Sequence, residues 1–194
     1  MDLYSADSTL FRAFNSGAAN PVFDVVMPFI TEVRNFYIPY AILFIVLLWK
    51  GGTRGRWCAL VLALTVLAAD PFSSRIVKEE VMRVRPCTAL DNVRLLVGCG
   101  AGKSFPSSHA VNNFAAAVVI SYFFRSALPY AFAIAALVAF SRIYVGVHYP
   151  GDALGGAAIG AAMAGVMILL WKWAVEGRSR KAEIPGPESG NVSS

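Results

Sequence analysis

Long runs of hydrophobic residues, broken by short polar segments, make up most of the chain after residue 34. A helix that crosses a bilayer needs about 20 predominantly apolar residues. Runs near this length occur at 35–50, 57–77, 107–124, 127–147 and 152–173. The first is short and can borrow residues from the stretch before it. The pattern therefore predicts an all-α fold, a polytopic membrane helix bundle with about five to six transmembrane helices.

The segment before the first run predicts two further helices. Residues 1–17 form an amphipathic pattern, which is typical of a helix that lies on a membrane surface. Its apolar side chains on roughly one side are Leu3, Leu10, Phe11 and Phe14. Asn20-Pro21 separates this helix from a second one at 22–33, which is apolar but contains two acidic residues. We expect the second helix at the membrane interface or against the bundle.

Two polar segments interrupt or follow the apolar runs. Residues 86–105 form a long polar excursion, and a loop of that length in a compact domain is usually functional or disordered. Residues 175–194 contain Gly, Pro, Ser and charged residues with almost no large apolar side chains. This composition predicts a disordered polar tail. The chain thus divides into one membrane domain, residues 1–174, and the tail, residues 175–194.

The composition indicates a lipid environment rather than water. Hydrophobic residues account for 57% of the chain and charged residues for 15%, with a mean hydropathy of +0.57. A soluble domain usually has about 25% charged residues. The net charge is +5, but the cations are scattered among loops and form no basic stripe, so nucleic-acid binding is not expected.

The order of the spans assigns the loops to two sides of the membrane. Residues 51–56, 125–126 and the tail share one side, and residues 78–106 and 148–152 share the other. The first side is rich in Lys and Arg and has few acids, which predicts that it is cytoplasmic. The opposite side has as many cations, so the charge rule alone discriminates weakly.

Three polar segments at the edges of apolar runs carry the candidate chemistry. Their residues are Lys78 and Arg85-Pro86; Pro106-Ser107-Ser108-His109; and Ser141-Arg142, His148 and Asp152. The two histidines are the only ones in the chain. Two imidazoles, three cations, a carboxylate and several hydroxyls are the groups needed to handle a phosphate.

The first segment also has a structural interpretation. Lys78 and Arg85 would lie two turns apart on one face of a continuing helix, which Pro86 would end. Two cations at the end of a span can equally reach the interface without binding a ligand. Their neighbour Arg83 is expected to be solvated or paired locally.

The other two segments are open to similar alternatives. Ser107 and Ser108 precede an apolar run as ordinary N-cap residues do, but a helix N-terminus also binds phosphate. Asp152 suits the first turn of a helix, and the break before it also lets the carboxylate orient His148. Tyr149 is expected to be an interface anchor.

The cysteines leave one structural question open. Cys87 and Cys99 both lie in the polar loop, where a disulfide between them would need an oxidising compartment. Two unpaired thiols are the alternative. No cluster of Cys, His and carboxylate residues has the spacing of metal ligands, so no metal or other cofactor is expected.

The three segments, in this order, resemble the signature of the type 2 phosphatidic acid phosphatase family: K-x6-R-P, then P-S-G-H, then S-R-x5-H-x3-D. The spacings match inside every segment from residue 78 to residue 152. The one departure is Ser108, where the signature has glycine. A serine still offers its backbone N–H to phosphate, so we expect the change to be tolerated.

The resemblance implies a metal-independent, integral-membrane lipid phosphatase. His148 would be the nucleophile that forms a phosphohistidine, and Asp152 would orient it. His109 would be the general acid for the leaving group and then the base for water. The phosphate clamp implied by the resemblance consists of Lys78, Arg85, Ser107, Ser108 and Arg142.

The substrate class follows from the resemblance only in part. The first candidate is undecaprenyl pyrophosphate, and phosphatidylglycerophosphate and lipid A phosphates are alternatives. Transfer of the phosphoryl group to another lipid would use the same histidines. Vanadate-dependent haloperoxidases share the signature but are soluble, and a non-enzymatic lipid-binding bundle would not need two histidines at these spacings. We expect a lipid phosphate and the bilayer as partners, and a site on the periplasmic side of a bacterial inner membrane; the sequence predicts no oligomeric state.

Overall fold

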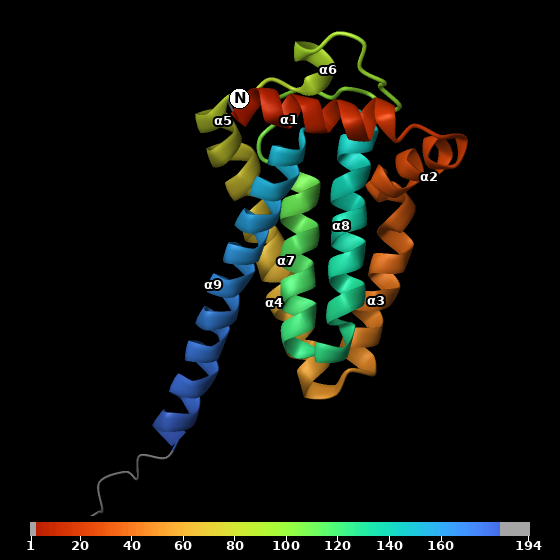
Figure 1. Ribbon diagram of the computed structural model, residues 1–194. Helices are drawn as coiled ribbons and strands as arrows, with labels where there is room; N and C mark the ends of the chain where they lie inside the picture. The colour runs from red at the N-terminus through yellow and green to blue at the C-terminus, as the bar shows by residue number, and fades with distance from the viewer. Residues whose placement is uncertain (1–2, 183–194) are drawn as a thin grey trace, which may run out of the picture.

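The computed structural model describes residues 3–182, and all regular elements within this range are helical (Figure 1). The longer elements are α1 (Leu3–Arg12), α2 (Pro21–Thr31), α3 (Tyr37–Trp49), α4 (Gly52–Pro71), α7 (Ser108–Phe123), α8 (Leu128–Tyr144) and α9 (Pro150–Ala182). Short helices or helical turns are η1 (Ala13–Gly17), η2 (Val33–Phe36), η3 (Phe72–Val77), α5 (Lys78–Val81), α6 (Pro86–Ala89) and η4 (Arg125–Ala127). The predicted all-α class is confirmed.

Helices α3, α4, α7, α8 and α9 run lengthwise and form the bundle (Figure 1). They occupy the five apolar runs of the sequence. The α3–α4 and α7–α8 connections lie at one end of the bundle, and α5, α6 and the α8–α9 connection lie at the other (Figure 1). This arrangement matches the alternation of sides expected from the order of the spans.

Length and composition, applied to the described helices, give fewer candidate membrane spans than the sequence pattern predicts. Three segments qualify alone: Gly52–Ala89, Arg125–Tyr144 and Pro150–Val175. The pair α2 and η2–α3, bent by 72°, would make a fourth. Helix α7 has 16 residues and is about 24 Å long, shorter than a bilayer core of about 30 Å. Length and composition alone therefore give three to four candidate spans among the described residues, whereas the sequence pattern predicts five to six.

The outer surface of the bundle is strongly apolar. Large hydrophobic side chains that are more than half exposed include Ile38, Ile42, Leu67, Leu154 and Leu169. A soluble monomer rarely exposes a continuous apolar surface of this kind. The hydrocarbon of a bilayer would cover these side chains.

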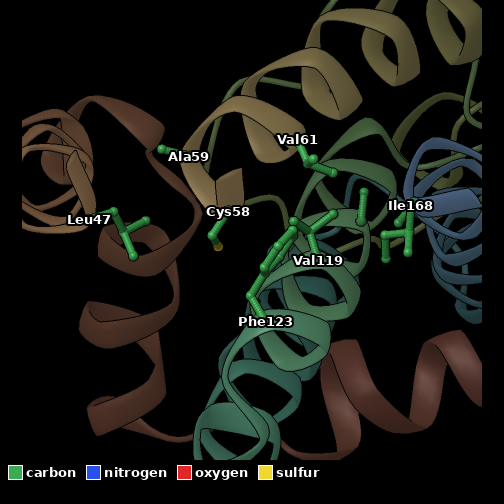
Figure 2. Packing of buried hydrophobic residues seen from close by; sticks show 9 residues of the cluster. Leu47, Cys58, Ala59, Val61, Val119, Phe123 and Ile168 are labelled. Carbon is green, nitrogen blue, oxygen red and sulfur yellow. The ribbon is translucent and has the colours of Figure 1, made fainter. Parts of the chain in front are cut away.

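One cluster of buried hydrophobic residues fills the interior of the bundle near the α3–α4 connection (Figure 2). Most of its residues are small or branched. Leu47, Val61, Val119, Phe123 and Ile168 from four helices form one buried cluster with Cys58. Cys58 is fully buried and unpaired, as expected for a packing residue.

Two glycines let α9 approach α7 closely. A Cβ at Gly160 would lie 2.1 Å from the carbonyl oxygen of Val111, and one at Gly156 would lie 2.7 Å from that of Ser107. Such contacts are forbidden to any larger residue, and small residues at this spacing are typical of packed membrane helices. The close approach brings the first turns of α7 and α9 together.

Helix α1 lies across one end of the bundle (Figure 1). Phe11 is buried, with its ring 5.6 Å from that of Tyr149, whereas Leu10 and Phe14 are exposed. Of the residues predicted for the apolar side of this helix, Phe11 therefore packs inside the protein, and Leu10 and Phe14 lie on its surface. The side chain of Leu3 lies outside the described part of the chain.

The predicted tail overlaps the last helix. Helix α9 continues to Ala182, so residues 175–182 are helical. Residues 183–194 lie outside the described residues.

Candidate active site

The three polar segments meet at the end of the bundle that α1 covers. Lys78 begins α5, His109 lies in the first turn of α7, Arg142 lies in the last turn of α8, and Asp152 lies in the first turn of α9. Arg85 precedes α6, and His148 occupies the α8–α9 connection. Four helices and two connecting segments therefore supply one cluster.

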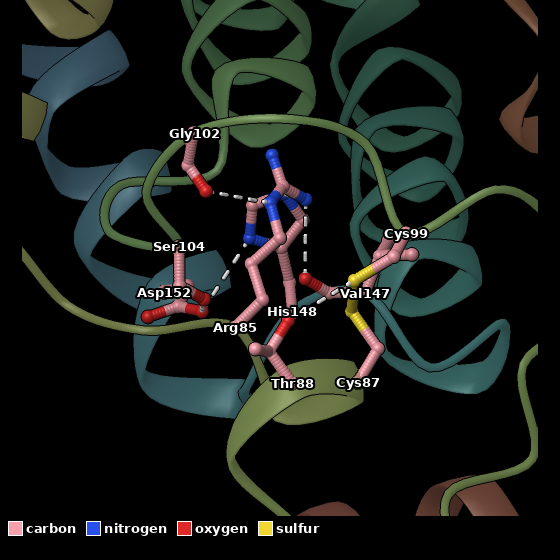
Figure 3. The surroundings of a disulfide bond; sticks show 9 residues. All are labelled: Arg85, Cys87, Thr88, Cys99, Gly102, Ser104, Val147, His148 and Asp152. Carbon is pink, nitrogen blue, oxygen red and sulfur yellow. Dashed lines mark hydrogen bonds and ion pairs between the residues drawn. A yellow bond between two sulfur atoms is a disulfide. The ribbon is translucent and has the colours of Figure 1, made fainter.

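His148 and Asp152 form the buried centre of the cluster (Figure 3). The Nδ1 atom of His148 lies 3.4 Å from Oδ2 of Asp152, and the two side chains are 2% and 0% exposed. An ionised carboxylate only accepts hydrogen bonds, so Nδ1 carries the proton and Nε2 keeps its lone pair. This orientation is the one expected from the sequence.

The Asp152 carboxylate is held from several directions. Its Oδ2 atom accepts hydrogen bonds from the Ser104 hydroxyl and from the backbone N–H of Tyr149, the latter at 2.8 Å. Its Oδ1 atom accepts from Nη1 of Arg83 at 2.7 Å. A buried carboxylate with this many donors is satisfied in its charged form.

Arg85 lies against the other side of the imidazole (Figure 3). Its Nη1 atom is 3.4 Å from Nε2 of His148 and 3.3 Å from the carbonyl oxygen of Val147. Its Nε atom donates to the carbonyl oxygen of Gly102 at 3.3 Å. A guanidinium therefore faces the unprotonated nitrogen of His148.

Burial keeps the imidazole of His148 neutral. Removal from water lowers the pKa of His148 to about 4, in opposition to the hydrogen bond and charge of Asp152, which raise it. Arg142 and Arg85 add to the lowering. At neutral pH the lone pair on Nε2 is consequently available.

The prediction that Lys78 and Arg85 share one face of a continuing helix is wrong. Helix α5 ends at Val81, and Met82 after it has a left-handed φ of 54°. Arg85 is extended. Pro86 begins α6 instead of ending a helix, a position that suits a residue without an N–H. Lys78 still lies within electrostatic range of Arg85 and Arg142.

Helix α7 begins at Ser108, as expected from the second segment. Ser107 is the N-cap residue, but its side chain makes no capping hydrogen bond. Its Oγ atom is buried and has no partner among the described residues. Its backbone N–H donates to the carbonyl oxygen of Asp152 at 3.1 Å. The hydroxyl is thus available to a ligand, while the backbone joins α7 to α9.

Thr31 at the end of α2 contacts two of the candidate residues, which the sequence analysis did not predict. The Nε2 atom of His109 lies 3.1 Å from the carbonyl oxygen of Thr31. Arg142 donates from Nη1 to the Thr31 hydroxyl at 2.6 Å. The Nε atom of Arg142 is buried without a partner among the described residues.

Two cavities border His109. A cavity of about 230 Å³ has a lining of mixed polarity, with residues that include Thr31, Glu32, Val97 and Arg142. A larger, mainly apolar cavity of about 460 Å³ lies between α3, α4 and α7, with lining residues that include Tyr40, Leu43, Leu62, Asp70 and Asn112. His109 therefore lies between a cavity of mixed polarity and a mainly apolar one. His148 lines neither of them.

Arg83 was expected to be solvated or paired locally, and this expectation is wrong. Its two terminal nitrogens bind Asp152 and Asp7, and its guanidinium carbon is 4.0 Å from the ring centre of Tyr149. Tyr149 is fully buried rather than an interface anchor. Arg83 lies inside the first motif, but no local pattern pointed to partners in α1 and α9.

Cys87 and Cys99 form a disulfide with a Cα–Cα distance of 6.1 Å (Figure 3). The bridge joins α6 to the segment that carries Gly102 and Ser104, which contact Arg85 and Asp152 respectively. The open question from the sequence is thereby answered in favour of the bridge. The covalent link braces the loop over the cluster.

Comparison with known proteins connects this geometry with a family. The model of the PAP2 superfamily matches residues 59–176. Lipid A 4'-phosphatase of Bacteroides thetaiotaomicron is 32% identical over 81% of this chain and 73% of its own length. Undecaprenyl-diphosphatase BcrC of Bacillus subtilis is 33% identical over 70% of this chain and 68% of its own length.

A solved structure shows the same fold. The crystal structure of a transmembrane PAP2-type phosphatidylglycerolphosphate phosphatase from Bacillus subtilis has a TM-score of 0.65 and 25% identity, covering 88% of this chain and 86% of that one. The family match, the sequence relatives and this structure agree with one another. The chain is an integral membrane protein that belongs to the PAP2 superfamily.

Proposed function

We propose that this protein is a lipid phosphatase that transfers a phosphoryl group to His148 and then to water. The observation that carries the proposal is the imidazole of His148, which is held by Asp152 at Nδ1 and faces Arg85 at Nε2. This places a neutral nucleophile next to a cation that attracts phosphate. The relatives named above are phosphatases of lipid phosphates and diphosphates.

The first step forms a bond between Nε2 of His148 and phosphorus while the bond from phosphorus to the leaving oxygen breaks. His109 gives its proton to that oxygen. Arg85, Arg142 and Lys78 neutralise the charge on the remaining phosphate oxygens, because positive groups fixed in advance stabilise the transition state. The carbonyl oxygen of Thr31, which now faces His109, has to be replaced by the leaving oxygen.

The second step hydrolyses the phosphohistidine. Water gives a proton to His109 and attacks phosphorus, and the bond between phosphorus and Nε2 breaks. Inorganic phosphate leaves, and His148 recovers its lone pair. Asp152 stabilises the positive charge that the imidazole carries while it is phosphorylated. Transfer to a lipid hydroxyl instead of water would follow the same route.

Purified protein in detergent is expected to release phosphate from lipid phosphates in the presence of EDTA, and orthovanadate should inhibit it. The clamp is built from cationic side chains, and vanadate imitates five-coordinate phosphorus. Phosphate release across a panel of lipid phosphates measures both effects. Absence of turnover on every member of the panel, or inhibition by EDTA that a divalent ion reverses, would contradict the proposed function.

The substrate is proposed from the apolar cavity next to His109. Undecaprenyl pyrophosphate remains the first candidate from the sequence, and its chain suits the apolar walls. A specific observation favours the second candidate, a lipid whose phosphate is carried by a glycerol or a sugar. Asn112 donates to Asp70 at 3.2 Å, and the Oδ1 atom of Asn112 is buried without a partner among the described residues.

The Asp70 carboxylate and the Oδ1 atom of Asn112 are hydrogen-bond acceptors in the lining of the apolar cavity near His109. An ionisable group is costly in such surroundings unless it has a function. Hydroxyl or amide groups next to the phosphate would satisfy these acceptors, whereas a polyprenyl chain offers no hydrogen-bond donor. The same panel decides between the candidates. A higher kcat/KM for phosphatidylglycerophosphate or lipid A phosphate than for undecaprenyl pyrophosphate supports the second candidate, and the reverse order supports the first.

We propose that the site faces the periplasm of a bacterial inner membrane. The opposite end of the bundle carries Lys50, Arg54, Arg56 and Arg125, as expected for the cytoplasmic side. The disulfide lies at the site end, and disulfides persist in oxidising compartments.

The disulfide provides the test of this placement. With thiols blocked in intact cells before lysis, mass spectrometry should find Cys87 and Cys99 in one bridged peptide. Replacing both by serine should lower the free energy of unfolding by about 3 kcal/mol, the value expected for a loop of this length. The main effect of the replacement should be on stability, with only a small change in kcat. Two blocked thiols in protein from intact cells would contradict the periplasmic placement.

A further inference from the structure

The catalytic carboxylate is joined to the N-terminal helix by a chain of ion pairs. Arg83 donates to Asp152 at 2.7 Å and to Asp7 at 2.6 Å, one terminal nitrogen to each carboxylate. The side chains of Arg83 and Asp7 are 19% and 14% exposed. Asp7 also accepts a hydrogen bond from the backbone N–H of Gly151 at 2.8 Å. Helix α1 is therefore attached both to Asp152 and to the start of α9.

We propose that Arg83 and Asp7 are positioning residues for the phosphatase reaction, and that α1 thereby completes the active site by fixing the Asp152 carboxylate that orients His148. The inference rests on the proposed function, because it concerns the same nucleophile. It adds two residues that the family signature does not specify: Arg83, at an unspecified position of the first motif, and Asp7, outside the motifs.

The hydrogen bonds divide the two oxygens of Asp152 between different tasks. Oδ1 binds Arg83, and Oδ2 faces His148, Ser104 and the backbone N–H of Tyr149. A carboxylate bound at both oxygens cannot rotate about its Cβ–Cγ bond without breaking a contact. Since a displacement of about 1 Å can cost about 10²-fold in rate, this restraint matters for the orientation of the imidazole.

An aromatic ring also packs against the flat face of the Arg83 guanidinium group. The ring centre of Tyr149 is 4.0 Å from the guanidinium carbon, and Tyr149 packs against Phe11 of α1. A planar cation that stacks on an aromatic ring while it binds two carboxylates is a geometry that lysine cannot reproduce. The arrangement is specific to arginine at this position.

Arg83 differs from the proposed clamp residues in its hydrogen bonds. Both of its terminal nitrogens are bound to carboxylates, whereas Arg142 has a buried Nε atom without a partner among the described residues. A phosphate ligand has to keep donors free for the substrate. Arg83 consequently acts through Asp152 rather than on the phosphate.

The positive charge of Arg83 also affects His148 electrostatically. The charged and titratable groups around this imidazole are Asp152 on α9, Arg85 before α6, Arg142 on α8 and His109 on α7. Arg83 compensates the charge of Asp152 from the side away from the imidazole. Without it, Asp152 would favour the protonated imidazole more strongly, and the nucleophile would be lost at a higher pH.

The experiment compares Arg83→Met, Arg83→Lys and Asp7→Asn with wild type and with the matched control Asp24→Asn. Asp24 is also an N-terminal aspartate, and it forms an ion pair with Arg94 at 2.6 Å, but it does not contact Asp152. The measurements are kcat, KM, the inhibition constant of orthovanadate, the pH dependence of kcat/KM and the melting temperature in detergent.

Arg83→Met should lower kcat by about 10- to 100-fold, the usual range for residues that orient a catalytic group, with KM and vanadate inhibition changed less than about threefold. Its acid limb in kcat/KM should move by about one unit toward higher pH. Arg83→Lys should keep the wild-type acid limb, because the charge remains, but recover only part of kcat. Asp7→Asn should lower kcat by about tenfold, and Asp24→Asn by less than about twofold.

Three results would overturn the inference while wild type remains active. Equal loss of kcat in Asp7→Asn and Asp24→Asn would mean that the ion pairs act only on stability. A large rise in KM and in the vanadate constant for Arg83→Met would make Arg83 a phosphate ligand. An unchanged acid limb in Arg83→Met would mean that Arg83 has no influence on the protonation of His148. An inactive wild type on the whole panel would instead contradict the proposed function itself.

Discussion

Replacing His148 or His109 by alanine is expected to abolish phosphate release while the protein still folds. His148 is the neutral imidazole beside Arg85, and His109 borders both cavities. Loss of a nucleophile or of a general acid costs at least about 10²-fold. No third histidine is present to substitute, since the chain contains only these two. Release of phosphate by purified protein, with the melting temperature as the control for folding, checks the expectation.

The two variants should differ in the step that they block. With an aryl phosphate, whose leaving group needs no proton, His109→Ala should still phosphorylate His148 and should accumulate the phosphoprotein, because the base for water is missing. His148→Ala should form no phosphoprotein with any substrate. Mass spectrometry after alkaline quenching distinguishes the two cases. Near-normal turnover by either folded variant would contradict the mechanism.

Asp152→Asn is expected to have the next largest effect, a loss of about 10²- to 10⁴-fold in kcat, in analogy with other histidines whose orienting carboxylate is removed. An amide at this position can donate to Nδ1 of His148, which favours the tautomer with the proton on Nε2. That tautomer has no lone pair at the nitrogen that faces Arg85. The variant also leaves Arg83 with Asp7 as its remaining carboxylate partner.

The measurement for Asp152→Asn is kcat on the best substrate of the panel, together with vanadate inhibition. Inhibition by vanadate should persist, because the proposed phosphate clamp is intact. The control is Asp24→Asn, which removes a carboxylate from a separate, partly exposed network with Arg94 and Tyr144. A kcat within tenfold of wild type would contradict the orienting role of Asp152.

Several features of this protein follow from the sequence because they are local. Apolar runs near the length of a bilayer predict the long helices, since lipid can satisfy no backbone polar group and only helices within one segment do so themselves. His148 and Asp152 lie four residues apart across a helix start, so their contact needs no distant element. The start of α7 at Ser108 is likewise predicted by a short polar segment before an apolar run.

Other local predictions were altered by tertiary contacts. The helix that holds Lys78 was expected to continue to Arg85, but it ends at Val81. In the structure, Arg83 then reaches Asp7 and Asp152, and Arg85 reaches the backbone of Val147. In a continuing helix, the helical periodicity would fix the directions of the Arg83 and Arg85 side chains, and they would not make these contacts. The gain from several charged hydrogen bonds outweighs the few lost in the helix.

Only the tertiary structure decided how α1 and α2 take part in the site. Asp7 and Arg83 are separated by 76 residues, Asp7 and Gly151 by 144, and Thr31 and Arg142 by 111. Hydrophobic periodicity records which face of a helix is buried, but it does not record which polar side chain meets which across the bundle. Those pairings depend on the close approach of α7 and α9 and on the position of α1 across their ends. The sequence by itself thus determined the helices and the residues of the three motifs, and the packing of the helices determined which further residues surround them.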